Sequence, residues 1–183
     1  MNSLKLPNWI KEEYPFKSNF FKLKDGHNIH FLDEGDPDNK NILIMVHGNP
    51  TWSYYYRNLI KAYKKNFRII AIDHLGCGLS DKPQDYDYTL ENHIENLGEL
   101  IRSLEILEAS FIVHDWGGAI GFGLICKNIC IPKKIVILNT ASFRSLKIPA
   151  RIGLCKVPFL GDFIVRRLNG FAGPATFMAV KKK

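Results

Sequence analysis

The stretch Phe111-Ile112-Val113-His114-Asp115-Trp116-Gly117-Gly118 decides the fold of this chain of 183 residues. Its aromatic and β-branched start predicts a buried strand, and the small residues after Gly117 predict a helix that follows at once. We expect a sharp turn between the two, with the side chain of Asp115 displayed at the corner. An aspartate before a helix is also a common N-cap, so the residue alone leaves two interpretations open.

Apolar runs at 41–47 and 67–73 predict further strands that are buried on both faces, as in a parallel sheet. A fourth buried strand is predicted at 135–138. Helical periodicity lies between these runs, at 56–63 and over 90–104. The second of these helices should begin at the N-cap Thr89, with Glu91 in its first turn, and should bury one face made of Leu90, Ile94, Leu97, Ile101 and Leu104.

The N-terminal part predicts a β-hairpin, because strand-like residues at 16–23 and 28–33 flank the turn signal Asp25-Gly26. Strands and helices alternate from residue 41 onward, which favours an α/β fold with a mostly parallel, doubly wound sheet. After Asn139 the pattern becomes irregular over 146–158, and a short amphipathic helix is predicted at 160–168. We therefore predict two parts, a sheet core at 1–142 and the start of a helical cap at 143–183.

The composition predicts a globular protein, since 46% of the residues are hydrophobic. The net charge of +7 indicates a solvated basic surface or a basic patch that faces an anionic lipid or acyl substrate. We expect no nucleic-acid module and no membrane span. The four scattered cysteines and the absence of a signal-peptide pattern predict reduced thiols and a cytoplasmic location. We expect no cofactor and no metal site.

A carboxylate at the corner suits attack on a saturated or strained carbon, which forms an alkyl ester on the protein. The departing group then needs hydrogen-bond donors where negative charge develops. Trp116 can offer its indole N–H, and Asn49, on the loop after the strand at 41–47, can offer its side-chain amide. Core packing for Trp116 and a turn role for Asn49 are the alternatives. Both residues follow strands at the edge of the sheet where such folds bind ligands.

Three motifs occur in order: His47-Gly48-Asn49-Pro50-Thr51-Trp52, Gly76-Cys77-Gly78-Leu79-Ser80-Asp81-Lys82-Pro83 and His114-Asp115-Trp116-Gly117-Gly118. With them the chain resembles the haloalkane-dehalogenase-like branch of the α/β-hydrolases. The resemblance implies that Asp115 is the nucleophile and that Asn49 and Trp116 stabilise the leaving group. It also implies that His47, Gly48 and Pro50 support the oxyanion loop.

Within that branch the chain resembles most the β-lactone decarboxylases of long-chain olefin biosynthesis. The resemblance rests on 73–83, on Leu138-Asn139-Thr140-Ala141 and on Arg167-Leu168-Asn169-Gly170-Phe171-Ala172. It implies a small hydrophobic substrate, an alkyl halide or a long-chain β-lactone, the latter giving an alkene and CO₂. It also allows an assembly with other enzymes of the olefin pathway.

A hydrolase of this type needs a histidine base and an acid, in the chain order nucleophile, acid, histidine. None of the six histidines follows Asp115. We therefore expect a chain truncated at its C-terminal end, with one open, apolar sheet edge, that is inactive or limited to a single turnover. Two alternatives stay open: an epoxide hydrolase, against which Asn49 argues, and a non-catalytic remnant or binding partner.

Overall fold

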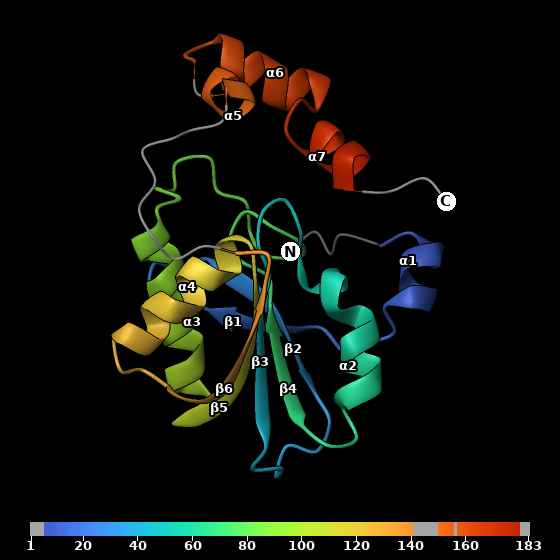
Figure 1. The fold of residues 1–183 in the computed structure, drawn as a ribbon, viewed down its shortest axis with the longest axis vertical. Coiled ribbons are helices and arrows are strands. Elements are labelled where there is room, and N and C mark those ends of the chain that lie inside the picture. The colour runs from blue at the N-terminus through green and yellow to red at the C-terminus, as the bar shows by residue number, and fades with distance from the viewer. Residues whose placement is uncertain (1–5, 141–149, 156, 180–183) are drawn as a thin grey trace. The chain divides into compact units, whose positions relative to one another are not determined.

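The structure is a computed structural model that describes residues 6–140, 150–155 and 157–179 (Figure 1). It divides into two compact units, residues 1–142 and 143–183. The first unit contains, in chain order, α1 (Asn8–Glu13), β1 (Asn19–Lys22), β2 (Asn28–Glu34), β3 (Ile42–Val46), the 3-10 helix η1 (Ser53–Tyr56), α2 (Arg57–Tyr63), β4 (Arg68–Ile72), α3 (Leu90–Ser103), β5 (Glu108–His114), α4 (Trp116–Cys126) and β6 (Ile131–Leu138). The second contains α5 (Ala150–Cys155), α6 (Leu160–Leu168) and α7 (Ala172–Ala179).

The six strands form one sheet in the order β1-β2-β4-β3-β5-β6. The strands β4, β3, β5 and β6 run parallel, whereas β1 and β2 form an antiparallel hairpin that joins the sheet at β4. The hairpin turns at Gly26, whose φ of +94° suits glycine. The predicted mostly parallel sheet with an N-terminal hairpin is therefore confirmed.

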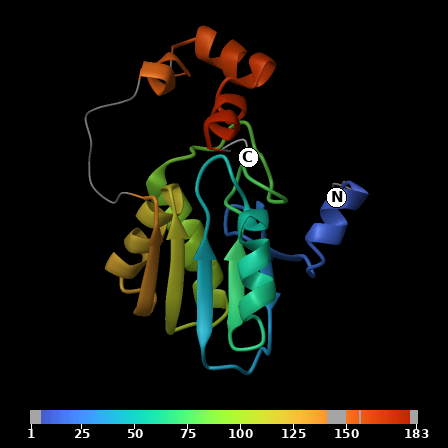
Figure 2. The same cartoon turned by 45° about the vertical axis from the view of Figure 1, so that its right-hand side comes forward.

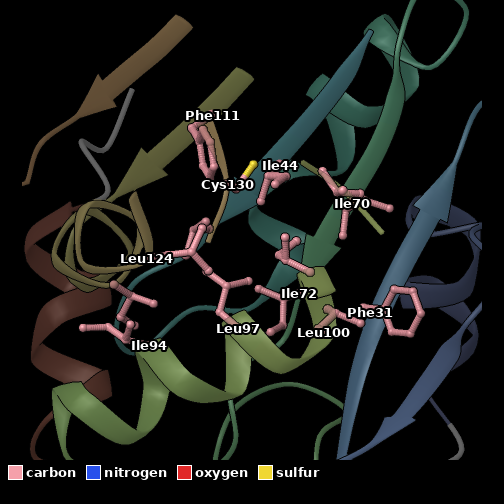
Figure 3. Close-up of a cluster of buried hydrophobic side chains, with 14 of the residues drawn as sticks. Phe31, Ile44, Ile70, Ile72, Ile94, Leu97, Leu100, Phe111, Leu124 and Cys130 are labelled. Atoms are coloured by element: carbon pink, nitrogen blue, oxygen red, sulfur yellow. The ribbon is translucent and has the colours of Figure 1, made fainter. Parts of the chain in front are cut away.

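Helices cover both faces of the sheet, as the alternation of strands and helices predicts. Figures 1 and 2 show α2 on one side and α3 with α4 on the other. The larger core lies under α3 and α4, where Leu97 and Leu124 meet Phe111 and Ile44 of the sheet (Figure 3). A second core lies under α2 and includes Ile60.

The helix α3 begins at Thr89, whose hydroxyl accepts a hydrogen bond from the N–H of Asn92 at 3.3 Å. The predicted N-cap and the acidic first turn are thus confirmed. The predicted buried face needs one correction, because Leu90 is 38% exposed while Leu100 is fully buried. Leu90 is the first residue of the helix, where the chain has only begun to pack against the sheet.

The strand β6 exists as predicted, but the prediction that it is buried on both faces is wrong. Val136 is 48% exposed and Ile137 is 57% exposed. Within the described residues β6 is the last strand of the sheet and pairs only with β5. A strand with one neighbour has fewer surrounding side chains than the central strands β3 and β4, so its apolar residues stay accessible.

In the second unit the predicted amphipathic helix at 160–168 is confirmed as α6. It ends at Asn169 in the left-handed conformation, after which the N–H of Gly170 donates to the carbonyl of Ile164 at 2.9 Å. The expectation of irregular chain over 146–158 is wrong for 150–155, which form α5. Ala141, 146–149 and Lys156 lie outside the described residues. Among the helices that the structure describes, none is long and apolar enough to cross a membrane.

Leu97→Ala should lower the free energy of unfolding by about 2–5 kcal/mol, because it removes a fully buried side chain between α3 and the sheet. Leu107→Ala is the matched control, since Leu107 is 76% exposed, and it should change that free energy by less than about 0.5 kcal/mol. Urea unfolding followed by circular dichroism measures both. Equal effects of the two substitutions would contradict the placement of α3.

Candidate active site

Asp115 lies at a strained corner between β5 and α4. Its φ is +51° and its ψ is −125°, a conformation that non-glycine residues rarely adopt. The corner is tied to its surroundings through the backbone: the carbonyl of Asp115 accepts hydrogen bonds from the N–H of Gly118 at 3.0 Å and from the hydroxyl of Thr140. The N–H of Asp115 donates to the carbonyl of Leu138, at the end of β6, at 3.4 Å. The predicted sharp turn is therefore present.

The carboxylate of Asp115 does not cap the helix, so the N-cap interpretation of this residue is wrong. Instead its Oδ1 accepts a hydrogen bond from the backbone N–H of Asn49 at 2.8 Å. Among the described residues Oδ2 has no hydrogen-bond partner. One carboxylate oxygen is thus fixed, and the other keeps a free lone pair.

Gly48 lets the loop after β3 approach the corner this closely. A Cβ atom at position 48 would overlap both Cβ and Oδ1 of Asp115. The parallel pairing of β3 with β5, in which Val46 lies opposite Val113, brings the two strand ends side by side. The turn after Gly48 is closed by its carbonyl, which accepts the N–H of Thr51 at 3.0 Å and the Thr51 hydroxyl at 2.9 Å, with Pro50 exposed in between.

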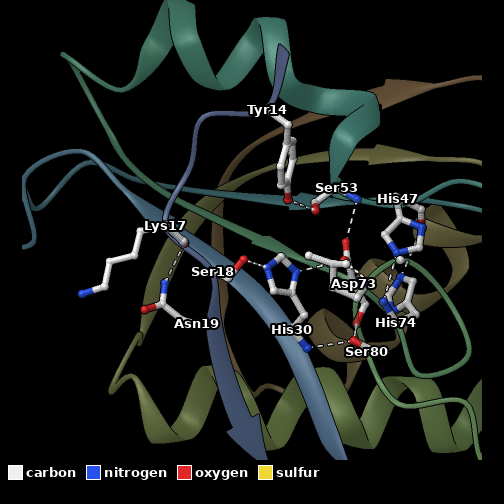
Figure 4. A network of polar contacts seen from close by, with 12 residues as sticks. Tyr14, Lys17, Ser18, Asn19, His30, His47, Ser53, Asp73, His74 and Ser80 are labelled. Carbon is white, nitrogen blue, oxygen red and sulfur yellow. Dashed lines mark hydrogen bonds and ion pairs between the residues drawn. The ribbon is translucent and has the colours of Figure 1, made fainter. Parts of the chain in front are cut away.

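His47 and His74 fix the start of the same loop through hydrogen bonds (Figure 4). The Nε2 of His47 accepts the backbone N–H of His74 at 3.0 Å, and the Nε2 of His74 donates to the carbonyl of His47 at 3.1 Å. Because Nε2 of His47 is an acceptor, its proton is on Nδ1, which donates to the carbonyl of Gly48 at 2.8 Å. Burial lowers the pKa of His47 and lowers that of His74 further, so both rings stay neutral.

These bonds leave His47 without a free nitrogen that could act as a base. The ring of His114 stacks on Tyr55 with centroids 4.6 Å apart, and its buried Nδ1 has no hydrogen-bond partner among the described residues. In the part of the chain that the structure describes, no histidine hydrogen-bonds to Asp115.

The backbone of Asn49 contacts the Asp115 carboxylate, and Trp116 follows Asp115 in the chain. The Oδ1 of Asn49 lies 3.7 Å from Sγ of Cys77 and can accept its S–H. Burial raises the pKa of Cys77 to about 11, so the thiol keeps its proton at neutral pH. Because the side-chain oxygen of Asn49 faces the Cys77 thiol, its NH₂ group points in another direction and can donate to a different acceptor. Trp116 is 43% exposed, which contradicts the core-packing alternative, and its indole N–H has no partner among the described residues.

Sequence reasoning missed a buried network centred on Asp73 (Figure 4). One oxygen of this carboxylate accepts the N–H of Ser53 at 2.7 Å. The other lies 2.9 Å from Nδ1 of His30 and accepts the N–H of Leu79 at 2.9 Å. The Ser80 hydroxyl donates to the carbonyl of Asp73 at 2.6 Å and accepts the N–H of His30 at 2.8 Å. Asp73 therefore fixes the loops that follow β3 and β4.

The only sequence signal for this network is a histidine inside the alternating strand at 28–33 and an aspartate directly after a buried run. Burial raises the pKa of Asp73, but the hydrogen bonds and charge of His30 and the N–H of Leu79 outweigh it, so the pKa lies below its ordinary value. His30 and Asp73 are both fully buried.

A surface cavity of about 310 Å³ lies elsewhere, at the amino ends of β3, β4 and β5, and is lined by residues such as Ile42, Arg68 and Glu108. It includes none of the predicted site residues. Functional groups of parallel sheets gather at the carboxyl ends of the strands, where Asp115 lies. The described residues contain no group of three or more side chains that could hold a metal ion.

Comparison with known proteins matches residues 41–168 to the model of the alpha/beta hydrolase fold family. A cis-3-alkyl-4-alkyloxetan-2-one decarboxylase of Shewanella oneidensis is 42% identical over 175 residues, which are 92% of this chain and 54% of the relative. The enzyme of the same name from Xanthomonas campestris is 35% identical over 93% of this chain and 60% of its own length. The chain thus spans about half the length of the curated relatives it matches.

Among solved structures, the haloalkane dehalogenase DpaA from Paraglaciecola agarilytica superposes with a TM-score of 0.73. It is 29% identical, and the match covers 85% of this chain and 55% of that one. These findings agree with the resemblance that the three sequence motifs indicate.

Asp73→Asn should lower the free energy of unfolding at neutral pH by about 3–5 kcal/mol, because it removes the buried carboxylate that contacts His30 and accepts the N–H groups of Ser53 and Leu79. The folded-state pKa of Asp73 is depressed, so its stabilisation is complete above the unfolded pKa of about 3.9 and is lost as the pH falls through the lower folded pKa. Urea unfolding at several pH values should therefore show the gap between wild type and variant closing in acid. Asp85→Asn, on an exposed residue, is the control, and a pH-independent gap would contradict the prediction.

Proposed function

Because the chain belongs to the α/β-hydrolase fold family, we propose that Asp115 is a nucleophile that displaces a leaving group from carbon. One observation carries the proposal: the carboxylate at the strained corner is held by the N–H of Asn49 through Oδ1, and Oδ2 is left free to attack. A serine at such a corner would form an acyl-enzyme from an ester. A carboxylate instead forms an ester by bonding to an alkyl carbon.

The substrate class that we propose is a cis-β-lactone with two alkyl substituents. It is supported by the names of the two curated relatives, since an oxetan-2-one is a β-lactone. In the first step a lone pair of Oδ2 attacks the saturated ring carbon that is bonded to the ring oxygen. The new carbon–oxygen bond forms as the old one breaks, and the ring oxygen departs as a carboxylate with the electron pair.

The second step returns the enzyme to its starting state. The new carboxylate is attached to the carbon next to the one that is esterified to Asp115. The bond between that neighbouring carbon and the carboxylate breaks and releases CO₂, and its electron pair forms the carbon–carbon double bond. The ester bond to Asp115 breaks at the same time, and the aspartate recovers its carboxylate. The sequence of steps is redox neutral and consumes no water, so it needs no histidine base.

The residues around Asp115 take supporting roles in this proposal. The amide NH₂ of Asn49 and the indole N–H of Trp116 donate to the departing oxygen as negative charge develops on it. Cys77 orients the Asn49 amide by occupying its oxygen. His47, Gly48 and Pro50 keep the loop in place, and the neutral His47–His74 pair adds no charge beneath it.

A second candidate is displacement of halide from an alkyl halide, which the similarity to haloalkane dehalogenases supports. Its first step is the same, with halide as the leaving group. Its second step differs, because water must attack the acyl carbon of the ester and a base must take a proton from that water. No histidine of the sequence follows Asp115, and none of the described histidines hydrogen-bonds to its carboxylate.

The proposal also includes a cytoplasmic location, which the four free cysteines support. An assembly with other enzymes of an olefin pathway remains a prediction.

The two substrate classes should give different products with this chain. An alkyl bromide should leave a stable ester on Asp115, seen as an alkali-labile mass increase that peptide mapping localises. A cis-β-lactone should give alkene and CO₂ over several turnovers without a lasting adduct. Alkylated cysteines form thioethers, which alkali does not cleave. Asp115→Asn is the control; an equal adduct on this variant, or no adduct and no alkene from folded wild type, would overturn the nucleophile assignment.

Asn49→Ala should slow the reaction of Asp115 with either substrate by about 10²–10³, because it removes a donor to the leaving group and keeps the backbone N–H that orients the carboxylate. Cys77→Ser should stay close to wild type, since a hydroxyl also donates, while Cys77→Ala should be slower. Rates from intact mass or alkene release test this, with urea midpoints to show intact folding. A Cys77→Ser rate no better than that of Cys77→Ala would contradict the orienting role.

A further inference from the structure

The net positive charge of the chain comes from its second unit. Residues 143–183 carry nine of the 25 Lys and Arg residues and one of the 18 acidic residues, Asp162, which gives them a net charge of +8. The first 142 residues are left with a net charge of −1. Such an asymmetry between the two parts of a chain indicates an anionic partner for the basic part.

The same unit exposes large apolar side chains. Phe159 is 94% exposed, Phe163 is 54%, Leu168 is 63% and Phe177 is 78%. Leu154, Val157 and Leu160 are also exposed. Exposed apolar side chains that gather on one small unit mark an interaction surface, because scattered single ones are the rule elsewhere on proteins.

The helix α6 carries both apolar and charged side chains. Leu160, Ile164 and Leu168 recur at every fourth position and share one side, whereas Asp162 and Arg166 are on the other and form an ion pair at 2.6 Å. Arg167, seven positions after Leu160, adds a cation on the apolar side itself. A short helix that combines exposed apolar side chains with cations suits an interface between water and hydrocarbon.

We propose that residues 143–183 bind the surface of an anionic lipid bilayer. Leu, Val and Phe side chains would enter the boundary between headgroups and acyl chains, and the Lys and Arg side chains would meet the lipid phosphates. A bilayer accounts for the whole exposed set better than single-stranded nucleic acid does, because the phenylalanines could stack on bases but Leu154, Val157, Leu160 and Leu168 could not. The binding is peripheral, since no described helix is able to span a membrane. It does not depend on the chemistry at Asp115.

Co-sedimentation of the 183-residue chain with vesicles tests the proposal. The chain should bind vesicles that contain about one-third phosphatidylglycerol, should not bind pure phosphatidylcholine, and should dissociate at about 1 M salt. Arg166→Gln with Arg167→Gln should weaken binding about fivefold or more, and Phe159→Ser with Phe163→Ser about tenfold or more. The matched controls in the first unit are Leu107→Ser and Lys65→Gln, both on exposed residues, and they should bind as wild type does.

A tryptophan at position 163 gives a second readout that preserves the apolar face. Emission of Phe163→Trp, taken as the difference from wild type, should be quenched by iodide in water and by brominated acyl chains once anionic vesicles are added. Shielding from iodide without vesicles would mean that protein covers the face and would overturn the proposal. Equal binding to neutral vesicles, wild-type binding by both double variants, or binding to a single-stranded oligonucleotide that the phenylalanine substitutions abolish would also overturn it.

Discussion

The hydrogen bond from the N–H of Asn49 to the carboxylate of Asp115 is the contact on which the rest of the site depends. It joins the loop after β3 to the corner after β5, and it exists only because the two strands are parallel neighbours. Gly48 removes the side chain that would separate them. The hydrogen bonds around His47 and Asp73 then fix the same loop from beneath and from its far end, at Ser53.

Two polar clusters, around His47 and around Asp73, are thus buried in the interior, where apolar side chains would carry no cost of desolvation. Burying Asp73 and the neighbouring histidines costs solvation free energy, and each hydrogen bond returns only part of it. In return, the clusters fix the backbone of the loops, because the N–H groups of Ser53, Leu79 and His74 each donate to one buried side-chain acceptor. These hydrogen bonds thereby fix the positions of the loops that follow β3 and β4.

The sequence predicts most of the sheet because β3, β4 and β5 are continuous apolar runs, and it predicts the corner because strand and helix patterns meet at Asp115. It fails for the burial of β6, whose apolar residues resemble those of a central strand although, among the described residues, the strand pairs only with β5. It fails also for the Asp73 network, since His30 reaches Asp73 through antiparallel pairing of β2 with β4 across 43 positions. Local patterns carry no information on such long-range pairing.

The backbone at Asp115 has one more consequence, a conflict between stability and function. A φ of +51° costs a non-glycine residue on the order of 1–3 kcal/mol that glycine would avoid. The carboxylate recovers little of this by capping, because it forms no hydrogen bond to the helix it precedes. Selection for a stable fold alone would place glycine at this corner. The aspartate is a residue that the fold tolerates, and the proposed role as a nucleophile gives a reason for its presence.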